Sequence, residues 1–300
     1  MTPALPAAVV ERFRAAGESV TVITEEPIDR GTGAATDALA RLTVHVRSAE
    51  GEPRNACLIR KRLSPLRSGR HGAGASDPRH WAYWRREADA YASGFLPAGP
   101  GLGAPRCFGV VGDDLYLEEV VGSVPPLPRA AEALARWQVP YDETLDRPWL
   151  SVDQLGRRLA VSSLDWGSVQ ADPRMVELWN SAGRLYERLA EVPRVLSHGD
   201  YSLGNLVDTG RDTVALDWAT VGWEPVGFDL AHLALSCGED PTAAYLEEPP
   251  VSELDPELVV LGFTTTVAVV GASRVHWMLS RGIEVPEWYV DFVWAHRPTP

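Results

Sequence analysis

The N-terminal third of the chain is patterned as short strands separated by turns. Apolar and β-branched residues gather in five runs, at 20–23, 40–46, 57–63, 107–111 and 115–120. Runs of this length, bounded by glycine, proline and aspartate, are typical of antiparallel strands with tight connections. A helical pattern at 4–16 precedes them. A second helix is expected from Asp77-Pro78 to about Gly94, because proline suits the first turn of a helix.

From residue 130 onward the pattern becomes helical. Helices are expected at 130–137, at 151–161 with Ser151 as the cap, and at 286–296. One long helix is expected to begin at Asp172-Pro173, and two further helices to begin at Asp240-Pro241 and at Asp255-Pro256. The proline-rich segment 122–128 separates the two patterns. A sheet followed by helices predicts an α+β fold with two lobes, residues 1–121 and residues 122–300.

One stretch of the second half is not helical, and it concentrates polar residues. Asp200 and Asn205 lie in a polar segment, a turn follows at 208–210, and the apolar run 214–216 leads to Asp217. We expect a hairpin of two short strands with the polar loop before the first strand and Asp217 after the second. This arrangement would gather two carboxylates and an amide, whose oxygens are ligands that magnesium takes alongside substrate phosphates.

These residues resemble the core of the aminoglycoside phosphotransferase and choline kinase superfamily, which shares the protein-kinase fold. The shared motifs are H-G-D-x-x-x-x-N from His198 to Asn205, L-D-W around Asp217, and D-L-A at Asp229. The resemblance implies that Asp200 is the catalytic base and that Asn205 and Asp217 ligate magnesium. His198 and Asp229 are expected to brace the loop. Ala219 departs from the family, where an acidic residue often follows the aromatic one. The alternative is that these side chains only form turns and cap a helix.

Lys61 is the only lysine of the chain, so 27 of the 28 basic residues (28 minus 1) are arginines. It lies in the third strand run, where the family has its phosphate-binding lysine. W-R-R-E-A at 84–88 resembles the family motif W-x-R-E-A, which implies that Glu87 forms an ion pair with Lys61. Arg60 or Arg62 could contact the phosphate instead, and Glu87 would then be a solvated helix residue.

Two further segments are expected to contact a nucleotide. The resemblance implies that Gly31, Thr32 and Gly33 cover the phosphates with backbone amides, although Gly-Thr-Gly is also a common hairpin turn. It also implies that backbone groups near Glu119 and Val121 read the adenine edge. The expected cofactors are ATP or GTP with Mg²⁺.

Composition limits the partners. The net charge of −13 argues against nucleic acid, whose phosphates need a basic face. Acidic clusters at 239–240, 247–248 and 253–257 could bind a cationic acceptor or could form a solvated face. The three cysteines show no C-x-x-C spacing, and we expect reduced, buried thiols in a cytoplasmic protein. The apolar stretch 259–272 is too short to span a membrane and contains threonines, so a buried helix is expected.

The sequence therefore predicts an ATP-dependent O-phosphotransferase with a two-lobed, protein-kinase-like fold, in which an antiparallel sheet and a helix form the first lobe. The resemblance implies a small hydroxylated acceptor: an aminoglycoside or another antibiotic, or else a metabolic amino sugar or amino alcohol. Rival functions are a metal-dependent hydrolase, a nucleotide-binding module without activity, and a protein kinase. The segment 218–227 is too short for a peptide-binding activation loop. The acceptor, the choice between ATP and GTP and the oligomeric state stay open.

Overall fold

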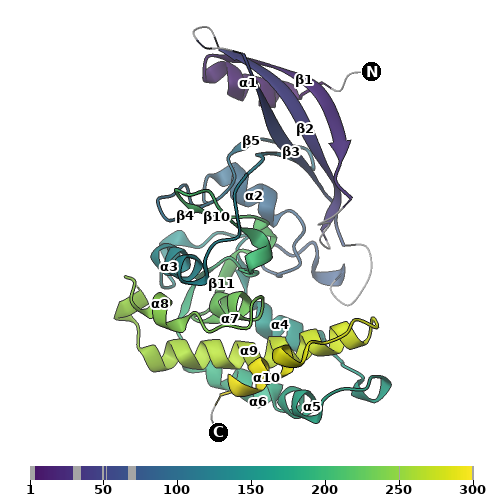
Figure 1. Cartoon of the computed structure of the whole chain (residues 1–300), viewed down its shortest axis with the longest axis vertical. Coiled ribbons are helices and arrows are strands. Elements are labelled where there is room, and N and C mark those ends of the chain that lie inside the picture. Colours follow the sequence, from purple (N-terminus) through teal and green to yellow (C-terminus); the bar gives the residue numbers. More distant parts are fainter. Residues whose placement is uncertain are drawn as a thin grey trace.

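The N-terminal part of the chain forms a five-stranded antiparallel sheet and the C-terminal part is mainly helical, as a computed structural model shows (Figure 1). The structure describes residues 4–29, 35–48, 51, 53–66, 72–249 and 251–298. The predicted α+β class is confirmed. The division of the chain at residue 121 stays a prediction.

The sheet has the strand order β1-β2-β3-β6-β5, and all neighbouring strands are antiparallel. Its strands are β1 (Glu18–Pro27), β2 (Thr36–Ser48), β3 (Arg54–Leu63), β5 (Cys107–Val111) and β6 (Asp114–Glu118). Helix α1 (Ala7–Ala15) packs against β1 and β5, and Phe13 stacks on Phe108 with 4.7 Å between ring centroids. Each predicted strand run is thus a strand, and β3 is the centre of the sheet.

Helix α2 is shorter than predicted, because it runs only over Arg86–Ser93 and turns occupy 78–85. The buried guanidinium of Arg86 explains this difference. It donates hydrogen bonds of 2.7 to 2.9 Å to the carbonyl oxygens of three residues, Pro78, His80 and Trp81. These carbonyl groups are directed at the guanidinium and not along a helix axis, and that of His80 also accepts the amide of Tyr83, three residues later, as in a turn.

The same guanidinium fastens α2 to the helical part of the protein. It donates to the carbonyl oxygens of Trp149 at 2.7 Å and of Ala219 at 3.0 Å. Arg86 is therefore surrounded by five backbone carbonyls from three segments. We call this set of contacts the Arg86 anchor.

The second part of the chain combines eight helices of the described residues with two small sheets. The helices are α3 (Leu127–Trp137), α4 (Gln154–Val161), α5 (Pro173–Asn180), α6 (Ala182–Glu187), α7 (Phe228–Ala234), α8 (Thr242–Leu246), α9 (Pro256–Leu279) and α10 (Glu287–Ala295). One sheet has the order β4-β10-β9, with β4 (Leu102–Gly103), β10 (Thr213–Ala215) and β9 (Leu206–Asp208). The other has the order β7-β11-β8, with β7 (Ser151–Val152), β11 (Gly222–Pro225) and β8 (Arg194–Ser197).

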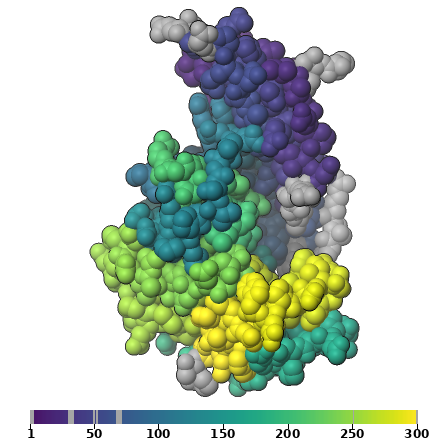
Figure 2. Space-filling view, in the orientation of Figure 1, coloured from purple at the N-terminus to yellow at the C-terminus, as the bar shows by residue number. Residues whose placement is uncertain are grey.

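The hairpin predicted around the polar loop is the antiparallel pair β9–β10. Strand β10 also pairs with β4 in parallel, so a segment near residue 102 lies beside one near residue 213. Figure 2 shows these two segments in contact between the sheet at one end of the molecule and the C-terminal helices at the other. The polar loop therefore lies close to the place where the two parts of the chain meet.

Two predicted helices of this part begin or continue differently. Ser151 lies in β7 and does not cap α4, whose cap is Asp153; its carboxylate accepts a hydrogen bond from the Gly156 amide at 3.2 Å. The long helix predicted after Asp172 is divided into α5 and α6 at Ser181. Asparagine, serine and glycine follow one another closely there, and all three are weak helix formers.

Helix α9 contains the apolar stretch 259–272 and packs against α5, α7 and α10. Among the described residues it is the one helix long and apolar enough to cross a membrane, and 67% of its most apolar window is buried in the protein. A helix that is apolar all round and covered by neighbours is typical of a core. The three cysteines, Cys57, Cys107 and Cys237, are free and partly buried, whereas buried thiols were expected.

Candidate active site

Lys61 joins the sheet to the helical part through two carboxylates. Its Nζ lies 2.6 Å from Oε2 of Glu87 in the first turn of α2, and 2.8 Å from Oδ1 of Asp217, which follows β10. The expected ion pair with Glu87 is therefore present. The neighbouring arginines face other partners, since Arg60 pairs with Glu25 and Arg62 with Asp114.

Burial and charge act in opposite directions on this cluster. Lys61 is 7% exposed and Glu87 1% exposed. Burial alone would lower the pKa of Lys61, but the charges of Glu87 and Asp217 outweigh it and hold this pKa above its usual range. Burial raises the pKa of Glu87, and Lys61 opposes that shift. A buried charge is tolerated only with such a partner, so the loss of either side chain would leave the other uncompensated.

The backbone turns sharply at Asp217. This residue has a φ of 60°, in the left-handed region that aspartate and asparagine enter more readily than most residues. The turn directs the carboxylate toward Lys61, and 38% of its side chain is exposed. Asp217 is therefore both an ion-pair partner and an accessible oxygen donor.

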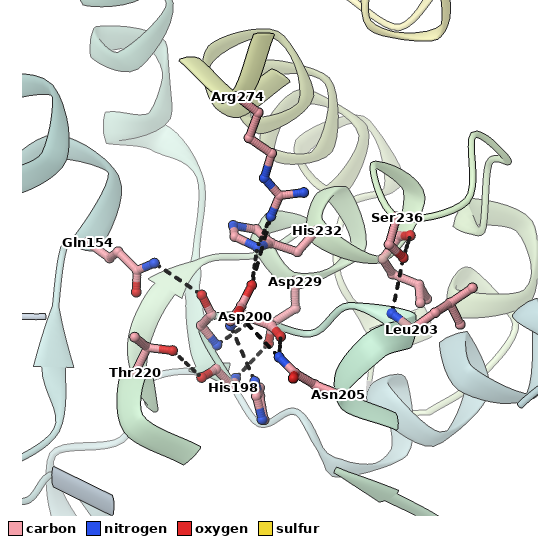
Figure 3. A network of polar contacts seen from close by, with 12 residues as sticks. Gln154, His198, Asp200, Leu203, Asn205, Thr220, Asp229, His232, Ser236 and Arg274 are labelled. Carbon is pink, nitrogen blue, oxygen red and sulfur yellow. Dashed lines mark hydrogen bonds and ion pairs between the residues drawn. The ribbon is translucent and has the colours of Figure 1, made fainter. Parts of the chain in front are cut away.

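Asp229 holds the polar loop in place from the first turn of α7 (Figure 3). One carboxylate oxygen accepts the amide of His198 at 2.7 Å and the other accepts the amide of Gly199 at 2.9 Å. Burial raises the pKa of Asp229 to about 7, and both amides oppose that shift. Asp229 was expected to brace the polar loop from the start of a helix, and these two hydrogen bonds are such a brace.

His198 connects the polar loop to the strand before Asp217. Its Nδ1 accepts the amide of Asp200 at 3.3 Å, so the proton of a neutral ring lies on Nε2, which then donates to the carbonyl of Leu216 at 2.9 Å. Burial lowers the pKa of His198, which favours this neutral ring. One tautomer satisfies both contacts, so the histidine fixes the spacing between Asp200 and Asp217.

Asn205 turns its amide nitrogen toward Asp200. Its Nδ2 donates to the backbone oxygen of Asp200 at 2.9 Å and to Oδ2 at 3.2 Å. Because the nitrogen makes both contacts, the amide oxygen is the atom directed elsewhere. Asn205 therefore offers an oxygen and at the same time limits the rotation of Asp200.

Two residues that the sequence did not single out contact the other oxygen of Asp200. His232 Nδ1 lies 3.2 Å from Oδ1, and Arg274 Nη2 lies 3.0 Å from the same ring nitrogen and 3.8 Å from Oδ1 (Figure 3). Burial would raise the pKa of Asp200, but His232, Arg274 and His198 hold it well below its usual range. Asp200 is therefore ionised at neutral pH.

The two missed residues differ in the signal that the sequence offers. His232 lies three residues after Asp229 on α7, so both point to one side of that helix. A predicted brace at Asp229 thus also places His232 beside the loop. Arg274 comes from α9, and only the tertiary packing of α9 on α7 brings it to Asp200. No spacing along the chain indicates that contact.

The residues expected near a nucleotide base are only partly available. The amide of Glu119 donates to the carbonyl of Cys57 at 3.2 Å, and its carboxylate accepts from Arg41 at 2.7 Å. Val121 is 80% exposed. The backbone carbonyl of Glu119 and the backbone of Val121 are therefore the groups that could meet an adenine edge. Gly31, Thr32 and Gly33 lie outside the described residues.

The oxygens of Asn205 and Asp217 fit a hard cation only in company with other donors. Across the described part of the chain, no group of three or more His, Cys, Asp and Glu side chains is placed to hold a metal. One carboxylate and one amide oxygen do suit magnesium, which keeps water and takes substrate phosphates as further ligands. The donor set therefore fits Mg²⁺ bound together with a nucleotide, and it does not resemble a zinc site.

The acidic clusters expected as an alternative acceptor site have structural partners where they are described. Glu248 pairs with Arg136 at 2.6 Å, Asp240 accepts the amide of Thr242, and Asp255 caps α9. The cavity beside Asp200, about 210 Å³, is lined by His232, Arg274 and other residues outside these clusters. These three members of the clusters thus form a surface ion pair, a turn contact and a helix cap.

Comparison with solved structures defines the class of fold. A putative fructosamine-3-kinase from Thermobifida fusca YX-ER1 superposes with a TM-score of 0.51 at 22% identity, covering 97% of each chain. Amicoumacin kinase hAmiN, solved with AMP-PNP, Ca²⁺ and Ami, superposes with a TM-score of 0.51 at 12% identity, covering 93% of this chain and 86% of that one. The fold is therefore kinase-like, as predicted.

The sequence of one part of the chain also matches a known family. Residues 125–249, which contain the polar loop, Asp217 and Asp229, match the family described as "Phosphotransferase enzyme family". No curated protein matches the chain. This part of the chain thus resembles a phosphotransferase family, in agreement with the resemblance drawn from the motifs.

Proposed function

We propose that the protein is an ATP-dependent O-phosphotransferase that transfers the γ-phosphoryl group to a hydroxyl of a small molecule. The observation that carries the proposal is the position of Lys61 between Glu87 and Asp217, beside a loop that presents Asp200 and Asn205. A phosphate-binding cation, two oxygen donors and an ionised carboxylate are the parts that phosphoryl transfer requires.

In this proposal Asp200 orients the acceptor hydroxyl and receives its proton. The acceptor oxygen bonds to the γ-phosphorus while the bond from that phosphorus to the departing ADP oxygen breaks, and the proton passes to Asp200 and then to water. A carboxylate with a low pKa is a weak base, so it accepts the proton late and contributes mainly by positioning. Asn205 limits the rotation of Asp200 for that task.

Lys61 contacts phosphate oxygens of the bound nucleotide, and Glu87 keeps the ammonium group in position. Asn205 and Asp217 hold Mg²⁺, which supplies neutralising charge for the phosphates. Backbone groups of Glu119 and Val121 face the base, for which ATP is proposed and GTP is the alternative. A cytoplasmic location is proposed with this assignment, because ATP is a cytoplasmic cosubstrate.

The class of acceptor is the finer part of the proposal. An antibiotic would make the enzyme a resistance or self-protection factor, and a sugar or amino alcohol would make it a metabolic kinase. One superposed structure is named an amicoumacin kinase and another a putative fructosamine-3-kinase, so these names alone do not decide the class of acceptor. The surroundings of Asp200 bear on the choice and are taken up in the next subsection.

Asp200→Asn tests the proposal directly, with ADP release from MgATP measured over a panel of hydroxylated acceptors. Nucleotide binding should persist, whereas turnover should fall by about 10² to 10⁴, the usual contribution of a positioned acid–base group. Asp113→Asn in an exposed hairpin turn is the control and should leave both unchanged. Near-normal turnover of the Asp200 variant would sink the assignment, and a wild type that binds MgATP without any transfer would favour a binding module.

A further inference from the structure

Two adjoining cavities extend from Asp200 along α4 and α9. The first, of about 210 Å³, includes Asp200, His232 and Trp179 in its lining. The second, of about 740 Å³, includes Arg281, and the two share Arg158, Ser273 and Arg274. Three residues line both cavities, so the two cavities adjoin, and we call them together the arginine cleft.

The charge of the arginine cleft is opposite to that of the chain. Three guanidinium groups line it, those of Arg158, Arg274 and Arg281, and among the described lining residues Asp200 is the one carboxylate. The chain as a whole carries a net charge of −13. Three arginines around one acid in so acidic a chain create a local positive field, which attracts anions and repels cations.

Aromatic faces and the loop position these guanidinium groups. The guanidinium carbon of Arg158 lies 4.0 Å from the ring centre of Trp81, and that of Arg281 lies 4.6 Å from the ring centre of Trp277. Arg274 approaches Asp200 to 3.8 Å. The ring of Trp277 supports the guanidinium of Arg281 from one face, and the planar edge of a guanidinium is the part that forms two parallel hydrogen bonds with an acidic group.

We propose that the acceptor is a hydroxylated small molecule that carries an acidic group, a carboxylate or a phosphate ester, which the arginine cleft binds while Asp200 meets the hydroxyl. The inference rests on the proposed phosphotransferase function and names its substrate class. A cationic acceptor would bring ammonium groups toward three guanidinium groups, an unfavourable juxtaposition of like charges.

The geometry also limits the shape of the acceptor. Arg274 reaches both Asp200 and the cleft, and an acidic group bound to it at about 2.8 Å lies only a few bonds from the hydroxyl that meets Asp200. Leu155, Leu159 and Val269 form an apolar wall of the first cavity. The structure thus favours a compact hydroxy acid or hydroxyalkyl phosphate whose carbon chain lies on that wall.

Binding is tested first, because it does not depend on turnover. Calorimetry compares small hydroxy acids with their amides, such as gluconate with gluconamide, and phosphate esters with their alcohols, such as glycerol 3-phosphate with glycerol. Glucosamine and kanamycin serve as cationic probes. At least one acid should bind about tenfold more tightly than its neutral partner, a difference of about 1.4 kcal/mol. The better of the two acid series identifies carboxylate or phosphate as the recognised group.

Variants then locate the bound acid. Arg281→Gln and Arg158→Gln should each reduce the preference for the acid over its neutral partner, and the double variant should abolish it, while Arg274→Lys should keep a reduced preference because its charge remains. Arg297→Gln is the matched control, since Arg297 also lies 4.0 Å over a tryptophan ring, that of Trp294, but outside the cleft. Circular dichroism confirms that each variant is folded. Arg281 lies in the turn after α9, so Arg281→Gln is the substitution least able to disturb the core.

The inference is overturned if neutral or cationic probes bind as tightly as the acids, if no acid binds at millimolar concentration, or if the preference survives the cleft substitutions. Transfer from ATP to kanamycin or glucosamine would overturn it while supporting the phosphotransferase function. Conversely, an acid that binds in the cleft but never receives a phosphoryl group would leave the recognition intact and count against the function.

Discussion

Lys61 shows how one side chain can be specified by its surroundings. It is buried on the central strand, and its ammonium group is balanced by Glu87 from α2 and Asp217 from the loop after β10. An ammonium is compact and makes contacts in several directions, whereas a guanidinium is a planar fork. The space between two carboxylates at 2.6 and 2.8 Å therefore suits lysine and not the arginine that the rest of the chain uses.

This leads to a labelling prediction. An acyl-phosphate analogue of ATP, which acylates amines near bound phosphates, should label Lys61, and excess ATP should suppress the label. Arg60→Lys is the control, since its side chain faces Glu25 and should gain no ATP-protected label. Lys61→Arg should lower turnover at least about tenfold although the charge is kept. An active arginine variant together with unprotected labelling would contradict the proposed role.

His232 leads to a prediction on pH. Burial lowers the pKa of His232 from about 6.5 to about 4. Between pH 4 and pH 6.5, His232 is therefore protonated in the unfolded chain and neutral in the folded protein. His232 thus supports stability fully above pH 6.5, and that support is lost as the pH falls toward 4. Relative to His232→Gln, the wild type should lose up to a few kcal/mol of unfolding free energy over this window, at about 1.4 kcal/mol per pKa unit.

Urea unfolding of both proteins at several pH values measures this difference. The comparison with the variant cancels the opposite contribution of Asp229, whose raised pKa favours stability at low pH. A difference in stability that is constant between pH 4 and 7 would show that His232 does not titrate in this way.

Each site residue that was predicted from the sequence belongs to a pattern that is visible within a short stretch of the chain or in its composition. Asp200, Asn205 and Asp217 surround a hairpin that can be identified from its turn and its apolar runs, and the lone lysine is visible in the composition. Arg274 and Arg158 were not found, because helices α9 and α4 reach the site only through the packing of the whole helical part. Long-range contacts of this kind leave no spacing to detect.

At the scale of elements, the strands were easier to predict than the helix boundaries. A strand run ends where its β-branched residues end, whereas the start of α2 is decided by the Arg86 anchor, a buried tertiary contact. The proline rule placed that start at Pro78, and three carbonyls turned toward Arg86 moved it to residue 86. The division at Ser181 had a weak local signal, the run of poor helix formers, which the apolar spacing concealed.

The Arg86 anchor leads to a prediction on the stability of the folded protein. Arg86→Met removes the donors for five buried or partly buried carbonyls, and each unsatisfied buried group costs about 1 to 3 kcal/mol. The unfolding free energy should therefore fall by several kcal/mol. Arg85→Met is the matched control, because the side chain of Arg85 is partly exposed, lies over the ring of Trp84 and pairs with Asp113 in a hairpin turn. Equal stability of the two variants in urea would refute the anchor.

At the scale of the whole molecule, several polar contacts join the N-terminal part of the chain to the helical part. Lys61–Asp217 and the Arg86 anchor are two of them, and the ion pair between Arg79 and Asp146 is a third. A nucleotide held by Lys61 on one side and by Asn205 and Asp217 on the other would add a further link. Figure 1 shows α2 between the two parts, where such a link acts.

Hydrogen exchange with and without MgATP measures this coupling. At a free ligand concentration of a hundred times Kd, binding stabilises the folded state by about 2.7 kcal/mol. Exchange should therefore slow by up to about a hundredfold both in β3 and in the β9–β10 hairpin, because the ligand is bound by both. Protection confined to the sheet would mean that the helical part does not take part in nucleotide binding. Removal of Mg²⁺ with a chelator should reduce protection first in the hairpin.

The Arg86 anchor has a consequence for control of the protein. A helix that carries a residue as important as Glu87 could serve as a switch if it were free to swing away from the sheet. Here the first residue of α2 is bound to the carbonyl groups of Trp149 and Ala219, and Glu87, the next residue, lies beside Lys61. Such a protein is ready from the moment it folds, and a cell would adjust its output by how much of it is made and how fast it is degraded.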